Sequence, residues 1–557
     1  MSIGFLRKVD TARPGALCAA FRRHFLSTCL VLVAAGALSA PGDAIAADYA
    51  AGGGQNNAPS GFATAVGSNS ATIGQNASAY GASAYGNGDR ATAIGSFTQA
   101  LGARATAIGS KSIAAGDYSS AIGDESTANG VEATSLGYKS NADGATALAL
   151  GVSATATGFV ATAVGYSSNA AGDHALAVGR GATSLGFQAT TFGNEARASG
   201  DGSMAIGPSS NAIGSQATAL GSNSIANGDF ATGTGYNSQA IGLNATASGA
   251  NSVASGANAS VFGAGSQATG SFATGFGASS VATGAQATAL GANSIANGDF
   301  ATGTGYNSQA IGLNATAVGA NTIASGATAS VFGAGAQATG SFATGLGASS
   351  VATGAQATAL GSNSIANGDF ATGTGYNSQA IGLNATAVGS NSVARDATAS
   401  AFGAGSQALG ANSVAIGAGS VATAANTVSF GTSGNERRLT NVAPGINPTD
   451  AVNMSQLSSM SSGFQSQLSS LQSQVWDNRT EARRGIAAAV ASATAPMPSA
   501  PGKTTWQMRG SMYRGEGGFG IGFAHRLNIA MPLSVVGGYG NGGGTEHTAY
   551  LGLSGEF

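Results

Sequence analysis

The side chains that could carry out catalysis or bind a metal are few in this 557-residue chain and lie far apart. His174, His525 and His547 are isolated from one another, and the two cysteines, Cys18 and Cys29, lie near the N-terminus. A catalytic or metal-binding constellation needs several different polar groups that converge on one place. We therefore expect no enzymatic reaction, no metal site and no cofactor, and we expect surface or lumen positions for the histidines.

Glycine accounts for 90 residues, but its motifs are not those of nucleotide or calcium sites. The many G-x-G-x-x-G matches open no strand–helix unit, and with this much glycine they arise by chance. Calcium-binding nonapeptide repeats and hexapeptide coils need periods of about nine and about six residues. The glycine period in this chain is fourteen, which fits neither class.

Repetition dominates the middle of the chain. The segment IANGDFATGTGYNSQAIGLNATA begins at Ile225 and recurs unchanged from Ile295 and from Ile365. Glycine also occupies every fourteenth position from Gly67 to Gly431, and the residue before it is usually Val, Ile, Leu or Phe. Glycine at fixed offsets supplies the backbone conformations that corners require.

Each fourteen-residue unit is expected to form two short strands and two turns, because apolar and small residues alternate within it. One such coil cannot bury its apolar face, but stacked coils share a continuous core. The sequence therefore predicts a β-solenoid on the order of 130 Å long, at roughly 4.8 Å per stacked strand. The 70-residue duplication then equals five coils, a block that was copied to lengthen the rod.

Charge is sparse. Only 8% of residues are charged, and no Lys or Arg occurs between Arg197 and Arg395. Capture of nucleic acid needs a basic patch, so no nucleic-acid partner is expected. Disorder is not expected either, since 43% of residues are hydrophobic. Binding by this middle region must rest on shape, hydrogen bonds and apolar contact.

The first 46 residues have the pattern of a cleaved export signal. Basic residues precede an apolar stretch from Phe25 to Leu38, and Ala44-Ile45-Ala46 supplies a small-x-small cleavage site. The apolar run is shorter than the about 20 residues that a membrane-spanning helix needs.

After Gly431 the fourteen-residue pattern stops and a helix is predicted. Pro448-Thr449-Asp450 indicates its start. Its apolar positions mostly step by three and four: Met460, Phe464, Leu468, Leu471, Val475 and Ala482. This spacing predicts a short coiled-coil seam, in which Asn478 could set the register as a buried polar residue. A surface helix of a globular domain is the alternative, but the sequence contains no such domain for it to cover.

The last part of the chain divides into four alternating segments. Phe519, Ile521 and Phe523 alternate with Gly520 and Gly522, which is the pattern of transmembrane β-strands with lipid-facing apolar residues. Four strands cannot enclose a lumen, but three chains supply twelve strands, and the lumen could hold three helices if the facing residues are small. Because open strand edges are not tolerated in lipid, a homotrimer is expected.

These segments resemble the YadA-like family of trimeric autotransporter adhesins over nearly the whole chain. Asn412-Ser413-Val414-Ala415-Ile416-Gly417 is similar to the family's head repeat, and Gly485-Ile486-Ala487-Ala488-Ala489 with the terminal strands is similar to its membrane anchor. Arg437-Arg438-Leu439-Thr440-Asn441-Val442 and Thr449-Asp450-Ala451-Val452-Asn453 are similar to its neck. The stalk is very short for the family, and the leader lacks its usual extended-signal pattern.

The resemblance implies a fold: an all-β head (a trimeric left-handed parallel β-roll), a short coiled-coil stalk, and a 12-stranded trimeric transmembrane β-barrel anchor with four strands per chain. The implied neck residues are Arg437, Arg438, Asn441, Asp450 and Asn453. The implied partners are outer-membrane lipid, host extracellular matrix or cell-surface molecules, and the barrel-assembly machinery, which reads a terminal aromatic such as Phe557. Gly520 and Gly522 would face the barrel lumen, and Asn412 to Gly417 would be a matrix-binding motif of the collagen-binding type.

The expected boundaries follow from these patterns: signal peptide 1–46, N-terminal lead-in 47–62, β-roll head 63–432, neck 433–457, coiled-coil stalk and lumen helix 458–495, and outer-membrane anchor 496–557.

The expected function is that of a self-translocating bacterial surface adhesin, which attaches to host cells or matrix, with autoaggregation as an added activity. Three copies of each weak contact multiply the attachment through avidity. The alternative is a structural coat or self-association protein without a host ligand. A surface-displayed solenoid enzyme is the third hypothesis, and it lacks convergent acids, bases or nucleophiles.

Overall fold

The computed structural model describes residues 49–58, 62–492 and 494–556. It separates into one unit that ends at Glu436 and another that begins at Arg437, and each is described by itself. The expected signal peptide and Phe557 lie outside the described residues.

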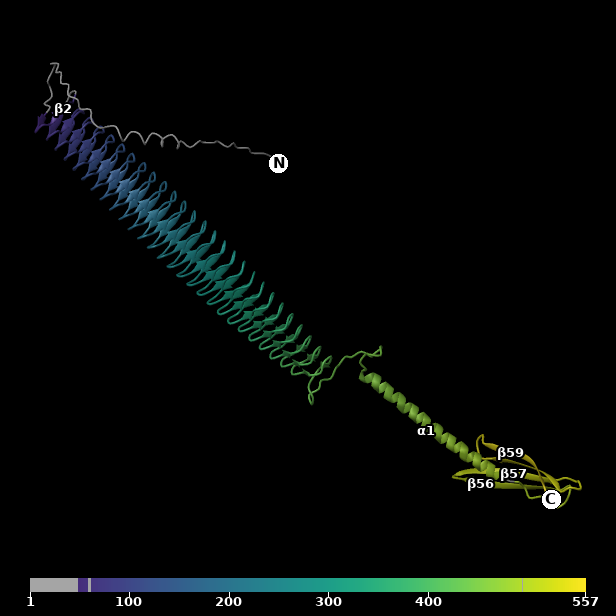
Figure 1. The fold of residues 1–557 in the computed structure, drawn as a ribbon. Helices are drawn as coiled ribbons and strands as arrows, with labels where there is room; N and C mark the ends of the chain where they lie inside the picture. The colour runs from purple at the N-terminus through teal and green to yellow at the C-terminus, as the bar shows by residue number, and fades with distance from the viewer. Residues whose placement is uncertain (1–48, 59–61, 493, 557) are drawn as a thin grey trace, which may run out of the picture. The chain divides into compact units, whose positions relative to one another are not determined.

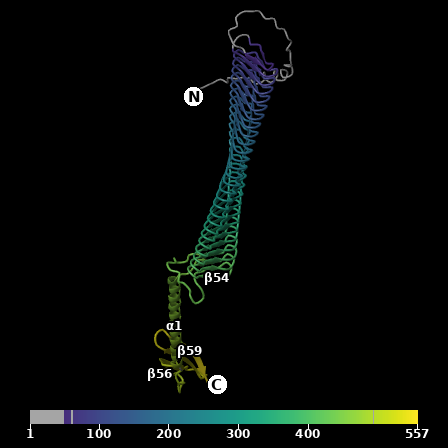
Figure 2. The same ribbon diagram turned by 90° about the vertical axis from the view of Figure 1, so that its left-hand side faces the viewer.

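The first unit is a stack of flattened coils, visible as a ladder of arrows and turns in Figure 1 and Figure 2. Strand β3 (Thr64–Val66) and every second strand up to β53 (Val414–Ile416) advance by fourteen residues, and β1 (Tyr49–Ala51) and β55 (Val428–Ser429) complete a 28-stranded parallel sheet, here called sheet A.

Strand β4 (Ala71–Thr72) and every second strand up to β54 (Val421–Ala422) form the opposite parallel ladder with β2 (Gln55–Asn56), here called sheet B. Each strand pairs in register with the equivalent strand of the next coil. For example, Ile108 of β9 (Thr106–Ile108) pairs with Ile122 of β11 (Ser120–Ile122). The fourteen-residue solenoid predicted from glycine spacing is confirmed.

The stack begins earlier than residue 63. In sheet A, Tyr49 pairs with Thr64, and in sheet B, Gln55 pairs with Ala71. One coil therefore lies within the segment expected to be a lead-in.

Small side chains fill the space between the two sheets. Ala105 and Ala107 point inward and are fully buried, as are their equivalents in most coils, and Ser, Thr, Gly or Val fills the remaining inner positions. The largest buried apolar side chains of the head are Val261 and Val331. Alternation in each strand then sends the bulky residue, such as Ile94, outward. The core is continuous but thin, because Ala contributes little apolar area.

Glycine is required at the corners by backbone conformation and by contact. Gly109 has φ +126°, which side-chain-bearing residues rarely adopt, and a Cβ there would collide with the carbonyl of Gly123 in the next coil. In the second turn, a Cβ at Gly102 would meet Gly116 in the same way. The close approach of stacked corners explains why the glycine period equals the coil length.

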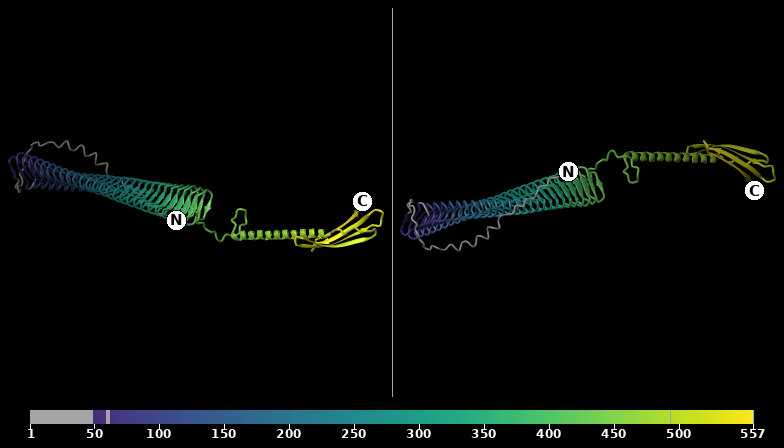
Figure 3. Two further views of the ribbon diagram at one scale, coloured as in Figure 1. Left: turned by 90° about the horizontal axis from the view of Figure 1, so that it is seen from below. Right: turned by 90° about the horizontal axis from the view of Figure 1, so that it is seen from above.

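The second unit contains one long helix and a four-stranded antiparallel sheet (Figure 3). Helix α1 runs from Met454 to Ala491. The sheet order is β56 (Thr504–Tyr513), β57 (Glu516–Arg526), β58 (Leu533–Asn541) and β59 (His547–Gly555). Within the described residues, no helix is both long enough and apolar enough to cross a membrane.

The helix begins four residues later than Pro448-Thr449-Asp450 indicated, so that prediction was wrong. Asn453 is the N-cap: its side chain accepts a hydrogen bond from the backbone N–H of Gln456, and the Gln456 side chain accepts from the Asn453 N–H. This reciprocal capping box satisfies two otherwise unpaired donors and fixes the start. Asp450 instead accepts hydrogen bonds from the preceding turn.

Candidate binding surfaces and anchor

Sheet A carries a row of bulky side chains on its outer face. The row, here called the apolar row, consists of the residue before each glycine of the series from Gly67 to Gly431. Leu220, Leu290 and Leu360 belong to this row and are 43%, 42% and 39% exposed. The core between the sheets has no room for these side chains. Thr234, Ser248, Thr304 and Thr374 interrupt this otherwise apolar row, and monomeric proteins rarely expose large contiguous apolar patches.

The recurring aspartates tie one coil to the next. The Oδ1 atom of Asp229 accepts a hydrogen bond from the backbone N–H of Ser215, fourteen residues earlier, at 2.8 Å. Asp299 and Asp369 do the same for Ala285 and Ala355. Sequence reasoning assigned these aspartates no role, because the partner is a backbone group one coil away.

Charged residues in neighbouring coils generally alternate in sign. Lys111 and Lys139 flank Glu125, with Nζ–Oε distances of 3.2 and 3.5 Å. Hydrogen bonding from Lys111 holds the pKa of Glu125 below its ordinary value. The hydrogen bond with Tyr138, followed by its charge and that of Glu125, raises the pKa of Lys139. These pairs are exposed, so each contributes little to stability.

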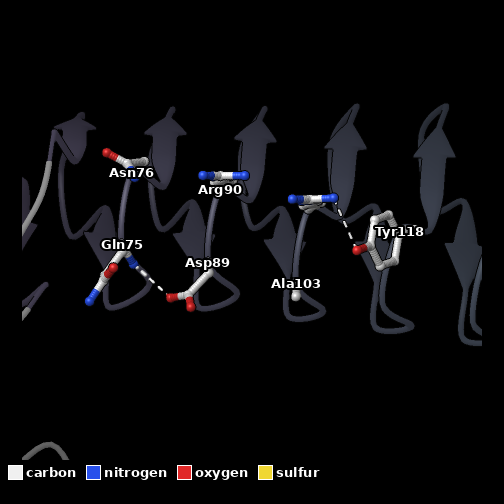
Figure 4. Close-up of a pocket in the computed structure, with 7 residues that line it drawn as sticks. Gln75, Asn76, Asp89, Arg90, Ala103 and Tyr118 are labelled. Carbon is white, nitrogen blue, oxygen red and sulfur yellow. Dashed lines mark hydrogen bonds between the residues drawn. The ribbon is translucent and has the colours of Figure 1, made fainter.

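One pair breaks this alternation. Arg90 and Arg104 occupy equivalent positions in neighbouring coils, with left-handed backbones, and line an open groove of about 300 Å³ near the start of the stack (Figure 4). Arg104 donates a hydrogen bond from Nη1 to the Tyr118 hydroxyl at 3.0 Å, and its guanidinium lies 5.1 Å from that ring's centroid. Asp89 points to the other side and accepts from the Gln75 backbone N–H. The groove thus presents two like charges beside an aromatic ring.

The residues Asn412 to Gly417 do not gather in a pocket. Ser413 and Ala415 are buried in the core, and Val414 and Ile416 face outward from sheet A, where Ile416 belongs to the apolar row. Asn412 lies in the second turn and donates from Nδ2 to Asn426 Oδ1 at 2.9 Å.

The expected neck residues do not form one cluster: Asp450 and Asn453 bind nearby backbone groups, and the other three are exposed. Asp450 Oδ2 accepts hydrogen bonds from the backbone N–H groups of Ile446 and Asn447, both at 2.9 Å, and the Asn447 bond is the larger cause that lowers the pKa of Asp450. Asn453 donates from Nδ2 to the carbonyl of Val442 at 3.0 Å. Arg437, Arg438 and Asn441 are exposed.

Gln456 is a neck residue that sequence reasoning missed. Its side chain exchanges two hydrogen bonds with the backbone of Gly445, at 2.8 and 2.9 Å, and so ties the neck to the first turn of α1. The signal was present in the sequence as Asn453 followed three residues later by Gln456, which is a capping-box spacing.

The predicted coiled-coil seam lies on the surface of the single chain. Leu457, Met460, Phe464, Leu468, Leu471 and Val475 are all exposed, by 46% to 65%. Asn478 is exposed as well. A helix of this length with an unburied apolar seam needs partner helices.

The sheet of the second unit has a glycine-rich face against α1. Gly520 and Gly522 are buried on this face, and a Cβ at Gly520 would collide with the carbonyl of Ala491. Gly518 and Gly540 approach Ala487 and Ala488 in the same manner. Glycine and alanine therefore let the helix backbone lie directly on the sheet.

The opposite face of this sheet is apolar. Its exposed side chains are Trp506, Met508, Met512, Phe519, Ile521, Phe523, Leu551 and Leu553. Arg484 of α1 forms a half-buried ion pair with Glu516 of β57, with Nε and Oε2 3.0 Å apart. The alternation predicted for lipid-facing strands is regular in β57 and β59. It is interrupted in β58, where Val536 and Gly537 are both buried.

The histidines remain separate. His174 lies between the rings of Phe159 and Phe187, at centroid distances of 5.4 and 5.8 Å. His525 and His547 belong to the four-stranded sheet, where the first hydrogen-bonds with Thr504 and the second with Tyr539. Over the part of the chain that the structure describes, no three His, Cys, Asp or Glu side chains gather as metal ligands.

Comparison with known families decides the assignment. The family model described as the YadA head domain repeat matches seventeen overlapping or successive windows between residues 87 and 433, which together span more than half of the chain. The coiled stalk of trimeric autotransporter adhesin matches residues 438–478. The chain belongs to the YadA-like family of trimeric autotransporter adhesins. Membership in this family implies a homotrimer displayed at the surface of the outer membrane.

Individual relatives of this trimeric autotransporter adhesin cover less of it. The autotransporter adhesin NhhA of Neisseria meningitidis serogroup B is 34% identical over 87 residues, which are 16% of this chain and 14% of the relative. The crystal structure of the collagen-binding domain of the Yersinia adhesin YadA is 23% identical, covers 45% of this chain and 86% of its own, and has a TM-score of 0.16.

Proposed function

We propose that this trimeric autotransporter adhesin attaches bacteria to host cells or extracellular matrix through its head. The observation that carries the proposal is the inverted distribution of side chains: Ala and Ser fill the coils, while nearly all bulky apolar and aromatic side chains of the head lie outside. Large side chains on the surface provide area for contact with other molecules and add little to the stability of the core. No catalytic step enters this function.

Three copies of the chain account for its unpaired faces. The apolar row of sheet A meets the equivalent rows of two partner chains, the seam of α1 forms a three-stranded coil, and three four-stranded sheets close a twelve-stranded barrel in lipid. In this arrangement Gly520 and Gly522 line the lumen against the helices, and Asn478 sets the helix register. Phe557 is the terminal aromatic for the barrel-assembly machinery, and the anchor assists export of its own head.

The neck residues connect a wide head to a narrower coil. Asp450 and Asn453 hold the chain between the last coil and α1 through backbone hydrogen bonds. Arg437, Arg438 and Asn441 are exposed. Among the head coils, Asn412 to Gly417 is the candidate collagen-type motif. Asn412 is exposed in the second turn, whereas Ile416 belongs to the apolar row that meets the partner chains.

Adhesion assays with the full chain test this proposal. Bacteria that display it should bind surfaces coated with collagen, fibronectin or laminin better than bacteria that display the anchor and stalk alone. Settling of the same cells in suspension measures self-association. Clumping without matrix binding would replace the proposal with the structural-coat alternative. The three copies of the 23-residue segment that begins at Ile225 favour that alternative, because matching rods can align side by side.

A further inference from the structure

A second row of side chains runs along the head, in the second turn of each coil. This row, here called the corner row, is the residue of that turn with a left-handed backbone, and its φ values from residue 230 to 426 lie between 54° and 59°. Its members over that range are Phe230, Asn244, Asn258, Phe272, Gln286, Phe300, Asn314, Thr328, Phe342, Gln356, Phe370, Asn384, Thr398, Asn412 and Asn426.

The five phenylalanines gain nothing from the fold. Their exposed fractions are between 51% and 61%, so they contribute little to a core. A left-handed backbone suits Asn or Gly and strains a bulky residue. The turn imposes this backbone on nearly every coil, so what distinguishes the five positions is the exposed ring.

The chemistry of the row is uniform. Aromatic rings alternate with amide and hydroxyl side chains, and no member of this range carries a charge. Asn244 donates from Nδ2 to Asn258 Oδ1 at 3.1 Å, and Asn412 donates to Asn426 Oδ1 at 2.9 Å, so where two asparagines are neighbours in the row their amides bond to each other. Ring faces supply flat apolar contact, and amides both donate and accept hydrogen bonds.

The spacing of the rings favours an extended, repeating ligand. Successive phenylalanines are separated by three coils and then two, which corresponds to roughly 14 and 10 Å at the strand spacing of about 4.8 Å. Phe230, Phe300 and Phe370 recur once per 70 residues, and a second phenylalanine follows the first two of them after three coils, at Phe272 and Phe342. A ligand that contacts several rings must run along the stack.

We propose that the corner row from Phe230 to Asn426 binds an uncharged polysaccharide. The apolar C–H faces of its sugar rings stack on the phenylalanines, and its hydroxyl groups exchange hydrogen bonds with the amides between them. The members from Phe230 to Asn426 offer no cation to an anionic polymer, whereas Arg90 and Arg104 occupy the same row nearer the start of the stack. A flexible apolar peptide would leave the amides unused. The inference rests on the proposed adhesin function and names the ligand class of one of its surfaces.

The test uses the full chain displayed on bacteria, with fluorescent dextran, galactomannan and hydroxyethyl cellulose as probes. The test variant replaces Phe230, Phe272, Phe300, Phe342 and Phe370 with Asn, a residue that the left-handed backbone accepts. The control variant replaces Tyr236, Tyr306 and Tyr376 with Asn; these tyrosines are 57–58% exposed, recur with the same block and lie in the other turn.

We expect wild-type and control cells to bind at least one probe equally, and the phenylalanine variant to bind it at least about tenfold more weakly, because lost contacts multiply along the chain. Equal binding by the phenylalanine variant, or no binding of any probe by wild-type cells with intact trimers, would overturn the proposal. So would loss of the trimer in the phenylalanine variant, since the row would then be a contact between protomers.

The same cells are also placed on collagen, fibronectin and laminin. Matrix adhesion that persists in the phenylalanine variant while polysaccharide binding is lost supports both this inference and the adhesin function. Polysaccharide binding without matrix adhesion in wild-type cells would contradict the host-matrix proposal and leave the corner row as the binding surface.

Discussion

Asp229 Oδ1 accepts a hydrogen bond of 2.8 Å from the backbone N–H of Ser215, which lies one coil earlier. The same contact recurs at Asp299 and Asp369 in the identical blocks. Stability in a stacked repeat is a sum of coil and coil-to-coil terms. The aspartate in each block is therefore a staple between two coils.

Changing these three aspartates to Ala should destabilise the head by about 0.5–1 kcal/mol per site, since each change leaves a backbone donor without its carboxylate acceptor. Thermal unfolding followed by circular dichroism measures the loss. The matched variant, Asp→Asn at the same three positions, keeps an acceptor oxygen and should retain most of the stability. Identical melting of the Ala variant and wild type would refute the staple role.

The apolar row can be tested with paired substitutions of equal exposure. Asp in place of Leu220, Leu290 and Leu360 puts charge on sheet A, where we expect partner chains, and should cost roughly 1–2 kcal/mol per site and weaken the trimer. Asp in place of Ile241, Ile311 and Ile381, which are 37–41% exposed on the outer side of sheet B, should leave the trimer intact. Chemical cross-linking of intact cells measures both. Equal effects of the two variants would mean that sheet A is not the contact face.

The glycine face of the anchor sheet makes a sharper steric prediction. Gly520→Leu should abolish the heat-resistant trimer, because its side chain would occupy the position of the Ala491 carbonyl. Gly517→Leu is the control, since that position is exposed and the nearest neighbour of an added Cβ is the Ser511 carbonyl oxygen at 3.9 Å. Gel mobility before and after heating gives the result, and a normal trimer with Gly520→Leu would exclude close helix packing at that strand.

The ion pairs of Glu125 with Lys111 and Lys139, here called the charge ladder, should make the stability of the head depend slightly on pH. The pKa of Glu125 is depressed by Lys111, so the ladder stabilises the head above the unfolded value near 4.5 and loses this contribution as pH falls through the lower folded value. Glu125→Gln should flatten the change in melting temperature between neutral pH and that acid window. Because the pair is exposed, added salt should shrink the difference. A wild-type curve that matches Glu125→Gln at low salt would contradict the ladder's contribution.

Much of the fold could be predicted because two periods dominate the sequence. Glycine at every fourteenth position fixed the coil length, and alternation around Gly520 and Gly522 located the anchor strands to within a few residues. The direction of the coil faces was harder to predict, since Ile108 and Ala107 alternate whichever one points inward. The burial of Ala107 and the exposure of residues such as Ile94 show that small side chains point inward.

Three features of the structure were missed or misplaced for different physical reasons. The staple formed by Asp229 uses a backbone N–H fourteen residues earlier, and no local sequence motif indicates this contact. The helix start was misplaced because Asp450 is a good capping residue, yet it caps the turn at Ile446 and Asn447 while Asn453 caps α1. Corner residues such as Phe230 gave no signal until their backbone conformation was known.

The most direct test of the account is the mass of the full chain extracted from outer membranes in mild detergent and measured by sedimentation. We expect the extracted protein to have three times the mass of one chain and to separate into single chains only after harsh denaturation. The reason is that the apolar row, the α1 seam and the open sheet all require partner copies. A single-chain mass under every mild condition would contradict the trimeric adhesin.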